Sequence, residues 1–465
     1  MTRIRKIIIF WLAVYSLFYL IESFIVITYP YEVSYTEGFI LNQAYLISKG
    51  ESIYKRIDEY PYLVANYPPL YPLLCAIFVK LFGISFIPGR LITFLSSIFV
   101  VGIIYKILKK ETAKDIAIIS ALFFISSSYI FKSTPLFRID MLGLFFSLLG
   151  LYIFIQTNRI FLPILCFLAA LYTKPTFVSA PLALAIFLLL TEKKKGFIFI
   201  FLMSLSYATI FLLINHLTSG GFYKHTFLYN LNIFIFKQAI KQYILTLQNH
   251  TILILFSLFY LFYTFTEKKI SILTIYFIIS CIIAVSVGKI GSNLSYFYEM
   301  IALSCILTGL SLEKFKNGVN EKIYNYLSNA AILLQLIIFL HMPYLTEPSA
   351  TRLSLKNSRR LSEIVAHTDG SILSEDGSLL IKNSKPILFQ FFEFTQLANQ
   401  KIWNQTEFVR DIKNRQFALI ILSFDVNCFV DEERLTPEMA EAIRGNYYVV
   451  DKIGDYYLYK PIISN

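Results

Sequence analysis

The sequence has little charge for its length, and this shortage excludes most water-soluble folds. Only 15% of its 465 residues are Asp, Glu, Lys or Arg, whereas 56% are hydrophobic and the mean hydropathy is +0.62. An average soluble domain carries roughly a quarter charged residues, so water cannot be the main solvent of this chain. Apolar runs of about 17 to 25 residues, long enough to cross a bilayer, recur through the first three quarters. The composition therefore predicts a polytopic membrane protein.

Regular cysteine and histidine spacing is also missing. The 5 cysteines are scattered, most of them inside apolar stretches, so the sequence predicts neither a disulfide framework nor a zinc site. His216, His225 and His250 have no zinc-binding spacing, and we expect them to be solvated or interfacial. No internal repeat of the kind that many secondary transporters carry is visible.

The positive charge is distributed as membrane topology requires. The net charge is +12, and most Lys and Arg form short clusters between apolar runs, so we expect no nucleic-acid partner. With a cytoplasmic N-terminus, residues 7–28 form the first span, and the basic clusters at 106–114 and 193–195 fall inside. Segment 68–83 is apolar but short and begins with two prolines. We expect it to be an interfacial helix, because counting it as a span would move 106–114 outside.

This threading predicts about eleven transmembrane helices in the cell membrane, and an odd number places the tail outside. A further amphipathic surface helix is expected around 234–247. Residues 1–343 would form a transmembrane domain whose first outer loop is 29–87, and residues 344–465 an extracytoplasmic domain. The predicted spans are 7–28, 88–108, 115–131, 141–156, 160–172, 176–190, 197–216, 252–265, 272–287, 300–312 and 324–341.

The tail changes character after the last apolar run. Helical spacing at 355–367 is followed by short apolar runs separated by further helical segments, which favours a small α/β domain. The expected strands are 371–373, 387–389 and 418–422, followed by a hairpin of 447–450 and 456–459.

Two groups of residues in the first outer loop are candidates for chemistry. Glu32 and Glu37 follow the first span directly, where a carboxylate acting as general base would reach a substrate from outside. Acidic residues are also ordinary in loops. Further along, Tyr67, Pro68, Pro69 and Tyr71 would shape a lipid-facing groove at headgroup level, or form only a turn with belt aromatics.

Basic residues at the outer face run against the general bias for positive charge inside. They are Arg90, Lys132, Arg138 and Lys174. An anionic ligand would explain them, because guanidinium and ammonium groups suit phosphate oxygens; snorkelling, or pairing of Arg138 with Asp140, is the alternative. A polar stretch with Asn293, Tyr296 and Glu299 opens a later span, where Glu299 would bind a sugar or cation or merely suit the helix dipole.

The order of these motifs resembles the GT-C glycosyltransferase superfamily, in its branch related to protein O-mannosyltransferases and to the aminoarabinose transferase of lipid A. The resemblance covers nearly the whole chain. Its segments are the acidic loop motif, 67–71, 89–91, 138–140, 172–175, 220–222, 291–299 and 373–376. It implies an inverting transferase that takes a sugar from a polyprenyl-phosphate carrier at the outer face. Glu37 matches the catalytic acid position of loop one, and Arg138 and Lys174 would stabilise the leaving phosphate.

One departure concerns metal dependence. Many relatives have an Asp-Glu pair at this position, whereas Thr36 precedes Glu37 here, and we expect no obligatory metal, although a divalent cation is possible. The acceptor, whether glycan, lipid or protein, is not specified by the sequence. A transporter or lipid-linked sugar flippase stays an alternative function, as does a non-catalytic scaffold whose tail binds carbohydrate or protein.

Overall fold

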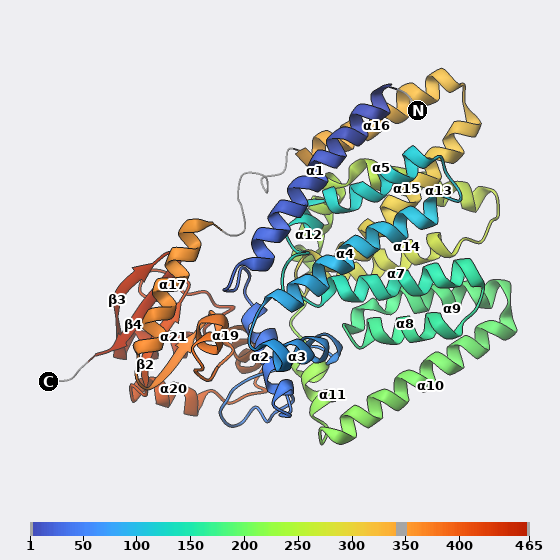
Figure 1. The fold of residues 1–465 in the computed structure, drawn as a ribbon. Helices are drawn as coiled ribbons and strands as arrows, with labels where there is room; N and C mark the ends of the chain where they lie inside the picture. Colours follow the sequence, from blue (N-terminus) through green and yellow to red (C-terminus); the bar gives the residue numbers. More distant parts are fainter. Residues whose placement is uncertain (1–2, 341–350, 463–465) are drawn as a thin grey trace. The chain divides into compact units, whose positions relative to one another are not determined.

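The computed structural model describes residues 3–340 and 351–462, and most of them are helical (Figure 1). The chain divides into two compact units. The helical unit comprises the described residues within Met1–Ile25, Arg90–Leu212 and Ile233–Pro348. The sheet unit comprises those within Val26–Gly89, Leu213–Asn232 and Ser349–Asn465, so loop-one residues belong with the tail. The predicted boundary at 343/344 lies outside the described residues.

Apolar helices account for the transmembrane prediction. In the described residues, 6 helices are long and apolar enough to cross a membrane. They are α1 (Arg3–Thr28), α4 (Ile87–Leu108), α7 (Asp140–Thr157), α10 (Lys193–Leu217), α15 (Tyr298–Gly318) with the short η4 (Leu294–Phe297) before it, and α16 (Glu321–Leu340). Other predicted spans are shorter helices: α5 (Lys114–Ser126), α8 (Phe161–Leu171), η1 (Pro175–Val178) with α9 (Ser179–Thr191), α13 (Thr251–Thr266), and α14 (Ile272–Ala284) with η3 (Val285–Gly288). The polytopic helical fold is confirmed, and the number of crossings stays a prediction.

Two of the long helices have opposite surroundings. The most apolar stretch of α10 is only 11% buried, whereas 89% of the corresponding stretch around α15 is buried. An apolar helix that buries so little must have lipid as its solvent, because water would penalise this surface. Helix α15 contains Ser304, Thr308 and Ser311, which are all buried, and it packs against α5, α13 and α14. It forms the centre of the helical unit.

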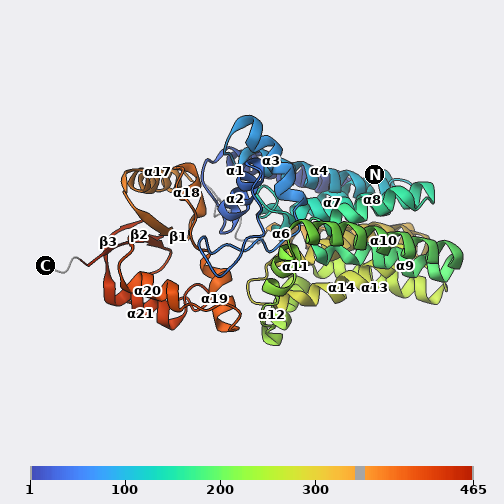
Figure 2. The same cartoon turned by 90° about the horizontal axis from the view of Figure 1, so that it is seen from below.

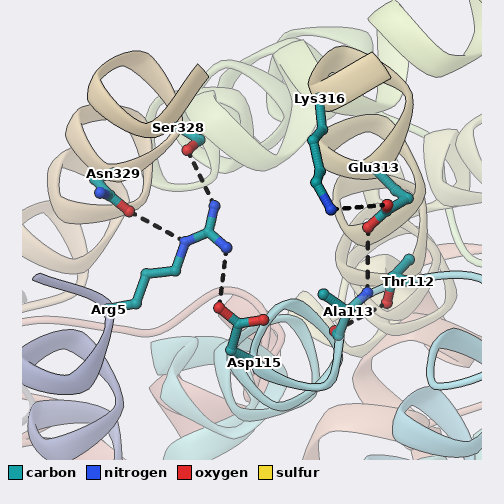
Figure 3. A network of polar contacts seen from close by, with 8 residues as sticks. All are labelled: Arg5, Thr112, Ala113, Asp115, Glu313, Lys316, Ser328 and Asn329. Atoms are coloured by element: carbon teal, nitrogen blue, oxygen red, sulfur yellow. Dashed lines mark hydrogen bonds and ion pairs between the residues drawn. The ribbon is translucent and has the colours of Figure 1, made fainter. Parts of the chain in front are cut away.

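A buried arginine joins three helices of this unit (Figure 3). Arg5 on α1 is 6% exposed and forms an ion pair with Asp115 on α5 at 2.9 Å. Its guanidinium also donates to Ser328 and Asn329 on α16, each at 3.3 Å. A guanidinium is costly to bury unless its donors are used, so this network fixes α1 against α5 and α16.

The predicted span 115–131 is wrong as a single helix. Helix α5 ends at Ser126, Ser127 is extended with ψ 131°, and a short helix α6 (Ser128–Phe131) follows. Serine hydroxyls compete for backbone hydrogen bonds, and three occur in succession here. The Ser126 hydroxyl bonds the Leu122 carbonyl at 2.9 Å, and the Ser127 hydroxyl lies 2.8 Å from Nε2 of buried His250.

The predicted amphipathic segment 234–247 is helix α12 (Phe236–Asn249). It is bent by 91° relative to α13, with the break at His250. Buried residues on α12 are few, namely Ala239 and Thr246. A helix turned so sharply from the next one does not continue its crossing, which suits a helix lying along the membrane surface.

The sheet unit contains a four-stranded sheet of order β1-β2-β4-β3. Its strands are β1 (Ser371–Ser374), β2 (Phe417–Leu422), β3 (Tyr447–Ile453) and β4 (Tyr456–Pro461). Strand β1 is parallel to β2, and the other pairs are antiparallel. Strand β2 is interior and has apolar residues on both faces, as a strand covered on both sides requires. The predicted tail helix, hairpin and two of the three single strands are therefore confirmed.

Helices cover both faces of the sheet (Figure 2). Helices α17 (Arg352–His367) and α18 (Gly377–Lys382) lie on one face, and α19 (Phe391–Asn399), α20 (Thr406–Lys413) and α21 (Pro437–Asn446) on the other. Leu419 and Ile421 of β2 face the core formed with α17 and α18. Ile420 and Leu422 face the core formed with α19, α20 and α21. The unit also holds α2 (Glu37–Ser48), α3 (Leu70–Phe82), α11 (Gly221–Thr226) and η2 (Leu228–Asn230).

Loop-one residues complete both cores of the sheet unit. Phe39 joins the core with α17 and α18, and Tyr62 joins the other. The prediction of a strand at 387–389 is wrong. Phe389 makes only an isolated parallel bridge with Tyr62, in which Tyr62 N donates to the Leu388 carbonyl at 2.8 Å. A bridge one residue long cannot continue as a ladder, because Gln390 already precedes the start of α19.

Candidate functional site

A buried ion pair lies where three segments of the helical unit meet. Lys174 Nζ is 2.7 Å from Asp140 Oδ1, with side chains only 4% and 8% exposed. The Ser295 hydroxyl donates to the same Asp140 oxygen at 2.7 Å and accepts from Lys174 at 3.3 Å. Lys174 Nζ also lies 4.3 Å from the centre of the Tyr296 ring, a cation–π distance. The structure therefore brings together three sequence-predicted residues, Asp140, Lys174 and Tyr296.

The local chain explains how this pair forms. Asp140 begins α7, where a carboxylate suits the helix dipole, and Lys174 precedes η1 in an extended conformation. Gly143 lies one turn after Asp140, and a Cβ there would fall 2.2 Å from the ring of Phe177 in η1. Only a glycine allows α7 and η1 to approach this closely, and that approach brings Lys174 within reach of Asp140.

Glu299 lies on the central helix α15 and has partners of its own. It is 6% exposed, and its two carboxylate oxygens accept from Tyr276 Oη at 2.5 Å and Ser179 Oγ at 2.7 Å. These bonds tie α15 to α14 and α9. Asn293 caps η4 by accepting from Ser295 N at 2.8 Å, and so fixes the serine that bonds Asp140. Sugar binding by Glu299 stays a prediction, and the observed contacts are internal ones.

The remaining predicted cations lie on neighbouring segments of this unit. Arg90, near the start of α4, is fully buried. One turn later, the Thr93 hydroxyl donates to the backbone carbonyl of Arg138 at 3.0 Å, so the segment before α7 runs beside α4. Lys132 is half-buried directly after α6. The four cations lie in α4, directly after α6, shortly before α7 and directly before η1.

Glu37, the predicted general base, begins α2 in the sheet unit and is fully buried. Its Oε2 accepts from the backbone N–H groups of Val33 at 2.6 Å and Ser34 at 3.3 Å. The residue before it, Thr36, has φ 92°, a left-handed conformation that β-branched side chains rarely adopt. Such strain costs about 1–3 kcal/mol and occurs preferentially at functional sites. This turn holds the Glu37 carboxylate in one orientation.

The tail contacts this turn through Glu32. Glu32 Oε2 accepts from Gly38 N at 3.0 Å, and Glu32 N donates to the Ser378 hydroxyl at 3.2 Å. A Cβ on Gly38 would lie 2.5 Å from the Ser378 nitrogen, so the starts of α2 and α18 are in direct contact. Asp376 caps α18. Burial raises the pKa of Asp376 above its usual range, and the nearby negative charge of Glu37 raises it further.

The aromatic and proline motif of loop one forms the start of helix α3 and the residues before it. Pro69 precedes the first turn of α3, and Tyr71 is fully buried with its hydroxyl donating to the Gly89 carbonyl at 2.9 Å. The Tyr67 carbonyl accepts from Tyr54 Oη at 3.2 Å, and Pro68 is buried. A groove at these residues stays a prediction.

Of the three histidines expected to be solvated or interfacial, two are buried and therefore not solvated. His225 is 1% exposed and His250 fully buried, while His216 is exposed. Both buried rings bond backbone or hydroxyl groups, a use that spacing along the chain does not reveal. Among the described residues, no three His, Cys, Asp or Glu side chains form a group that could hold a metal. Metal dependence stays untested.

Sequence reasoning missed the neutral partners that organise both clusters. Ser179, Tyr276 and Ser295 hold the carboxylates of the helical unit, and Ser378 connects the tail to loop one. Hydroxyl residues are common in membrane helices, so nothing in the sequence distinguishes these four. Asp376-Gly377-Ser378 does contain a signal, because Asp before a short helix is a favoured cap.

The chain is similar to known proteins in both sequence and structure. Residues 66–219 match the family described as dolichyl-phosphate-mannose-protein mannosyltransferase. No curated protein matches the sequence. The crystal structure of ArnT from Cupriavidus metallidurans bound to undecaprenyl phosphate is similar, with TM-score 0.63, 13% identity and 98% of each chain covered. Its apo structure gives TM-score 0.60, 12% identity and 97% coverage of each chain.

Proposed function

We propose that this membrane protein, which has the fold of the GT-C glycosyltransferases, transfers a sugar from a polyprenyl-phosphate donor to an acceptor hydroxyl at the extracytoplasmic face. The observation that carries the proposal is the likeness over 98% of the chain to a protein that binds undecaprenyl phosphate. The match of residues 66–219 to a mannosyltransferase family supports sugar transfer as the reaction. A polyprenyl phosphate would keep its chain in the lipid and present the sugar phosphate at the membrane surface.

The proposed reaction is an inverting displacement. The Glu37 carboxylate takes the proton from the acceptor hydroxyl as its oxygen forms a bond to the anomeric carbon. The bond from that carbon to the phosphate oxygen breaks on the opposite face, and the phosphate keeps the electron pair. Burial and the strained turn at Thr36 support this role for Glu37, because a preorganised carboxylate needs no rearrangement before it accepts the proton. Glu32 acts on the same turn through Gly38.

The leaving group needs cationic stabilisation more than protonation. A phosphate monoester is stable as an anion, so neither a general acid nor an obligatory metal is required by the chemistry. Arg90, Lys132, Arg138 and Lys174 would hold the phosphate. Lys174 is oriented for this by Asp140 and Ser295, both within hydrogen-bond distance of its ammonium group.

Sugar release from radiolabelled polyprenyl-phosphate sugars by the purified protein in lipid tests the proposal. We expect Glu37→Gln to reduce transfer by at least a hundredfold while donor binding survives, because the amide cannot accept the proton. Glu432→Gln, at an exposed glutamate of the same unit, is the matched control and should retain full activity. Equal transfer by wild type and Glu37→Gln would remove Glu37 as base, and no transfer from any carrier would favour a flippase.

A further inference from the structure

The sheet unit contains a cavity that none of the proposed catalytic residues lines. Its volume is about 810 Å³, within the range of ligand sites. It is lined by loop-one residues 54–61, by several residues between 218 and 229, and by Ile402. Its polar and aromatic side chains include Tyr54, Arg56, Asp58, Tyr60, Lys224 and Tyr229. All belong to the same compact unit.

One wall of this cavity is held in place by a buried histidine. His225 Nδ1 accepts from Ala65 N at 3.1 Å, and Nε2 lies 2.6 Å from the Lys55 carbonyl, to which it donates. Both ring nitrogens are thereby used, and burial lowers the pKa of His225 to about 4, so the ring is neutral. The rings of Tyr54 and Tyr229 pack edge-on against it, with centroids 5.6 and 5.2 Å away. The aromatic wall is therefore rigid before any ligand arrives.

Another part of the lining combines the Tyr60 ring with the charged pair of Arg56 and Asp58. Tyr60 is 37% exposed, its ring lies 4.3 Å from that of Tyr62, and its hydroxyl donates to Asp411 at 3.0 Å. Arg56 donates to both oxygens of Asp58, at 2.9 and 2.5 Å, while the arginine side chain stays 73% exposed. The cavity lining thus offers a hydrogen-bond donor, Arg56, and an acceptor, Asp58, as well as the partly exposed ring of Tyr60.

We propose that this cavity binds carbohydrate, namely the glycan of the acceptor. Sugar rings present a C–H face that packs on tyrosine, and adjacent hydroxyls that both donate to carboxylates and accept from guanidinium or ammonium groups. A largely apolar ligand would make no use of the charged groups of Arg56, Asp58 and Lys224, and a simple anion would not use three tyrosines.

The acceptor role rests on the proposed transferase function, whereas carbohydrate binding does not. Lys55 lines this cavity and also a smaller one beside α2, the helix that begins with Glu37. The two cavities thus share Lys55, and the smaller one borders the helix that begins with the proposed base.

Binding of chitotriose and trigalacturonic acid to the full-length protein in nanodiscs, measured by saturation-transfer NMR and titration, tests the proposal. We expect one of the two to bind, with affinity reduced at least tenfold by Tyr60→Ala and by Lys224→Ala. Tyr60→Phe keeps the ring and should retain binding, and Tyr448→Ala removes a similarly exposed tyrosine on β3 as control. Thermal unfolding of each variant checks that the unit is folded.

Two results would overturn the carbohydrate site: no binding of either trisaccharide, or binding unaffected by both cavity variants. A separate readout distinguishes this failure from failure of the transferase proposal. Transfer to a saccharide acceptor should fall in Tyr60→Ala, whereas Tyr448→Ala should keep both this transfer and the release of sugar from the donor to water. Saccharide binding by the wild-type protein without sugar transfer from any carrier would support the cavity and contradict the proposed reaction.

Discussion

At the scale of single residues, the helical unit depends on paired charges. Asp140 and Lys174 are both nearly excluded from solvent, so removing one leaves the other buried without its counter-charge. We expect Asp140→Asn to lower the stability of the protein by roughly 3 kcal/mol, because an uncompensated buried ammonium costs this much. Thermal unfolding in nanodiscs measures the change.

The double variant Asp140→Asn/Lys174→Met separates charge from packing. It should recover most of the lost stability, since no unpaired charge remains. Glu267→Gln, which breaks an exposed pair with Lys269 at 3.6 Å, should change stability very little. If Asp140→Asn proves as harmless as this control, the pair does not stabilise the unit.

His225 makes the sheet unit sensitive to acid. Its pKa is lowered from 6.5 to about 4, so below pH 6.5 the unfolded chain takes up a proton that the folded protein does not. Stability contributed by His225 is therefore present above pH 6.5 and lost as pH falls toward 4, by at most roughly 3 kcal/mol. The measurement is the melting temperature of wild type and His225→Gln between pH 7 and 4.5.

The wild type must be compared with His225→Gln because the carboxyl group of Glu393 changes stability with pH in the opposite direction. Burial raises the pKa of Glu393 to about 7, so its contribution to stability increases as pH falls below 7. The difference between wild type and His225→Gln cancels this contribution. That difference should shrink steadily with acidification, and a constant difference would show that His225 does not titrate as described.

At the scale of elements, close approach of α7 and η1 sets the geometry around Lys174. Gly143→Ala places a methyl group 2.2 Å from the Phe177 ring, which is itself buried. We expect a loss of about 1–3 kcal/mol, because a packed ring cannot give way without shifting η1. Gly143→Ala should also weaken donor binding if Lys174 holds the phosphate. Thermal unfolding and donor titration measure the two effects.

A control for this change exists on another helix. Gly102 in the interior of α4 has no atom within 4 Å of its Cβ position. Gly102→Ala should therefore be neutral or stabilising by about 0.5–1 kcal/mol through helix propensity alone. Gly143→Ala/Phe177→Leu should recover part of the loss. Equal effects of the two glycine variants would contradict the steric explanation.

At the scale of the whole molecule, burial separates the helices that face lipid from those that do not. A photoactivatable lipid probe should label peptides of α10 strongly and those of α15 weakly, because their apolar stretches are 11% and 89% buried. The lengths are similar, 25 and 21 residues, so labelling reports surroundings rather than size. Mass spectrometry of the digested protein gives the ratio, and equal labelling would contradict this arrangement.

The sequence alone determined that the chain is a membrane protein and that its C-terminal residues form a small α/β domain. Apolar runs with basic ends predict membrane helices because charges cannot stay in lipid, and the alternation of runs after residue 350 predicts a small sheet. The break at Ser127 and the isolated bridge at Phe389 escaped prediction. Both depend on hydrogen bonds to distant residues, His250 and Tyr62, which no local pattern reveals.

The tertiary structure decided which polar side chains meet. The pattern singled out Asp140, Lys174 and Glu299 as costly charges in an apolar chain, but not that Lys174 bonds Asp140 while Glu299 bonds Tyr276. It singled out Glu37, but not the contact between loop one and Ser378, more than three hundred residues away. Hydrophobicity is read from each residue alone, whereas the pairing of polar groups depends on how distant segments pack. The membrane character of the chain therefore follows from its sequence, whereas the pairing of its polar groups is decided only by the fold.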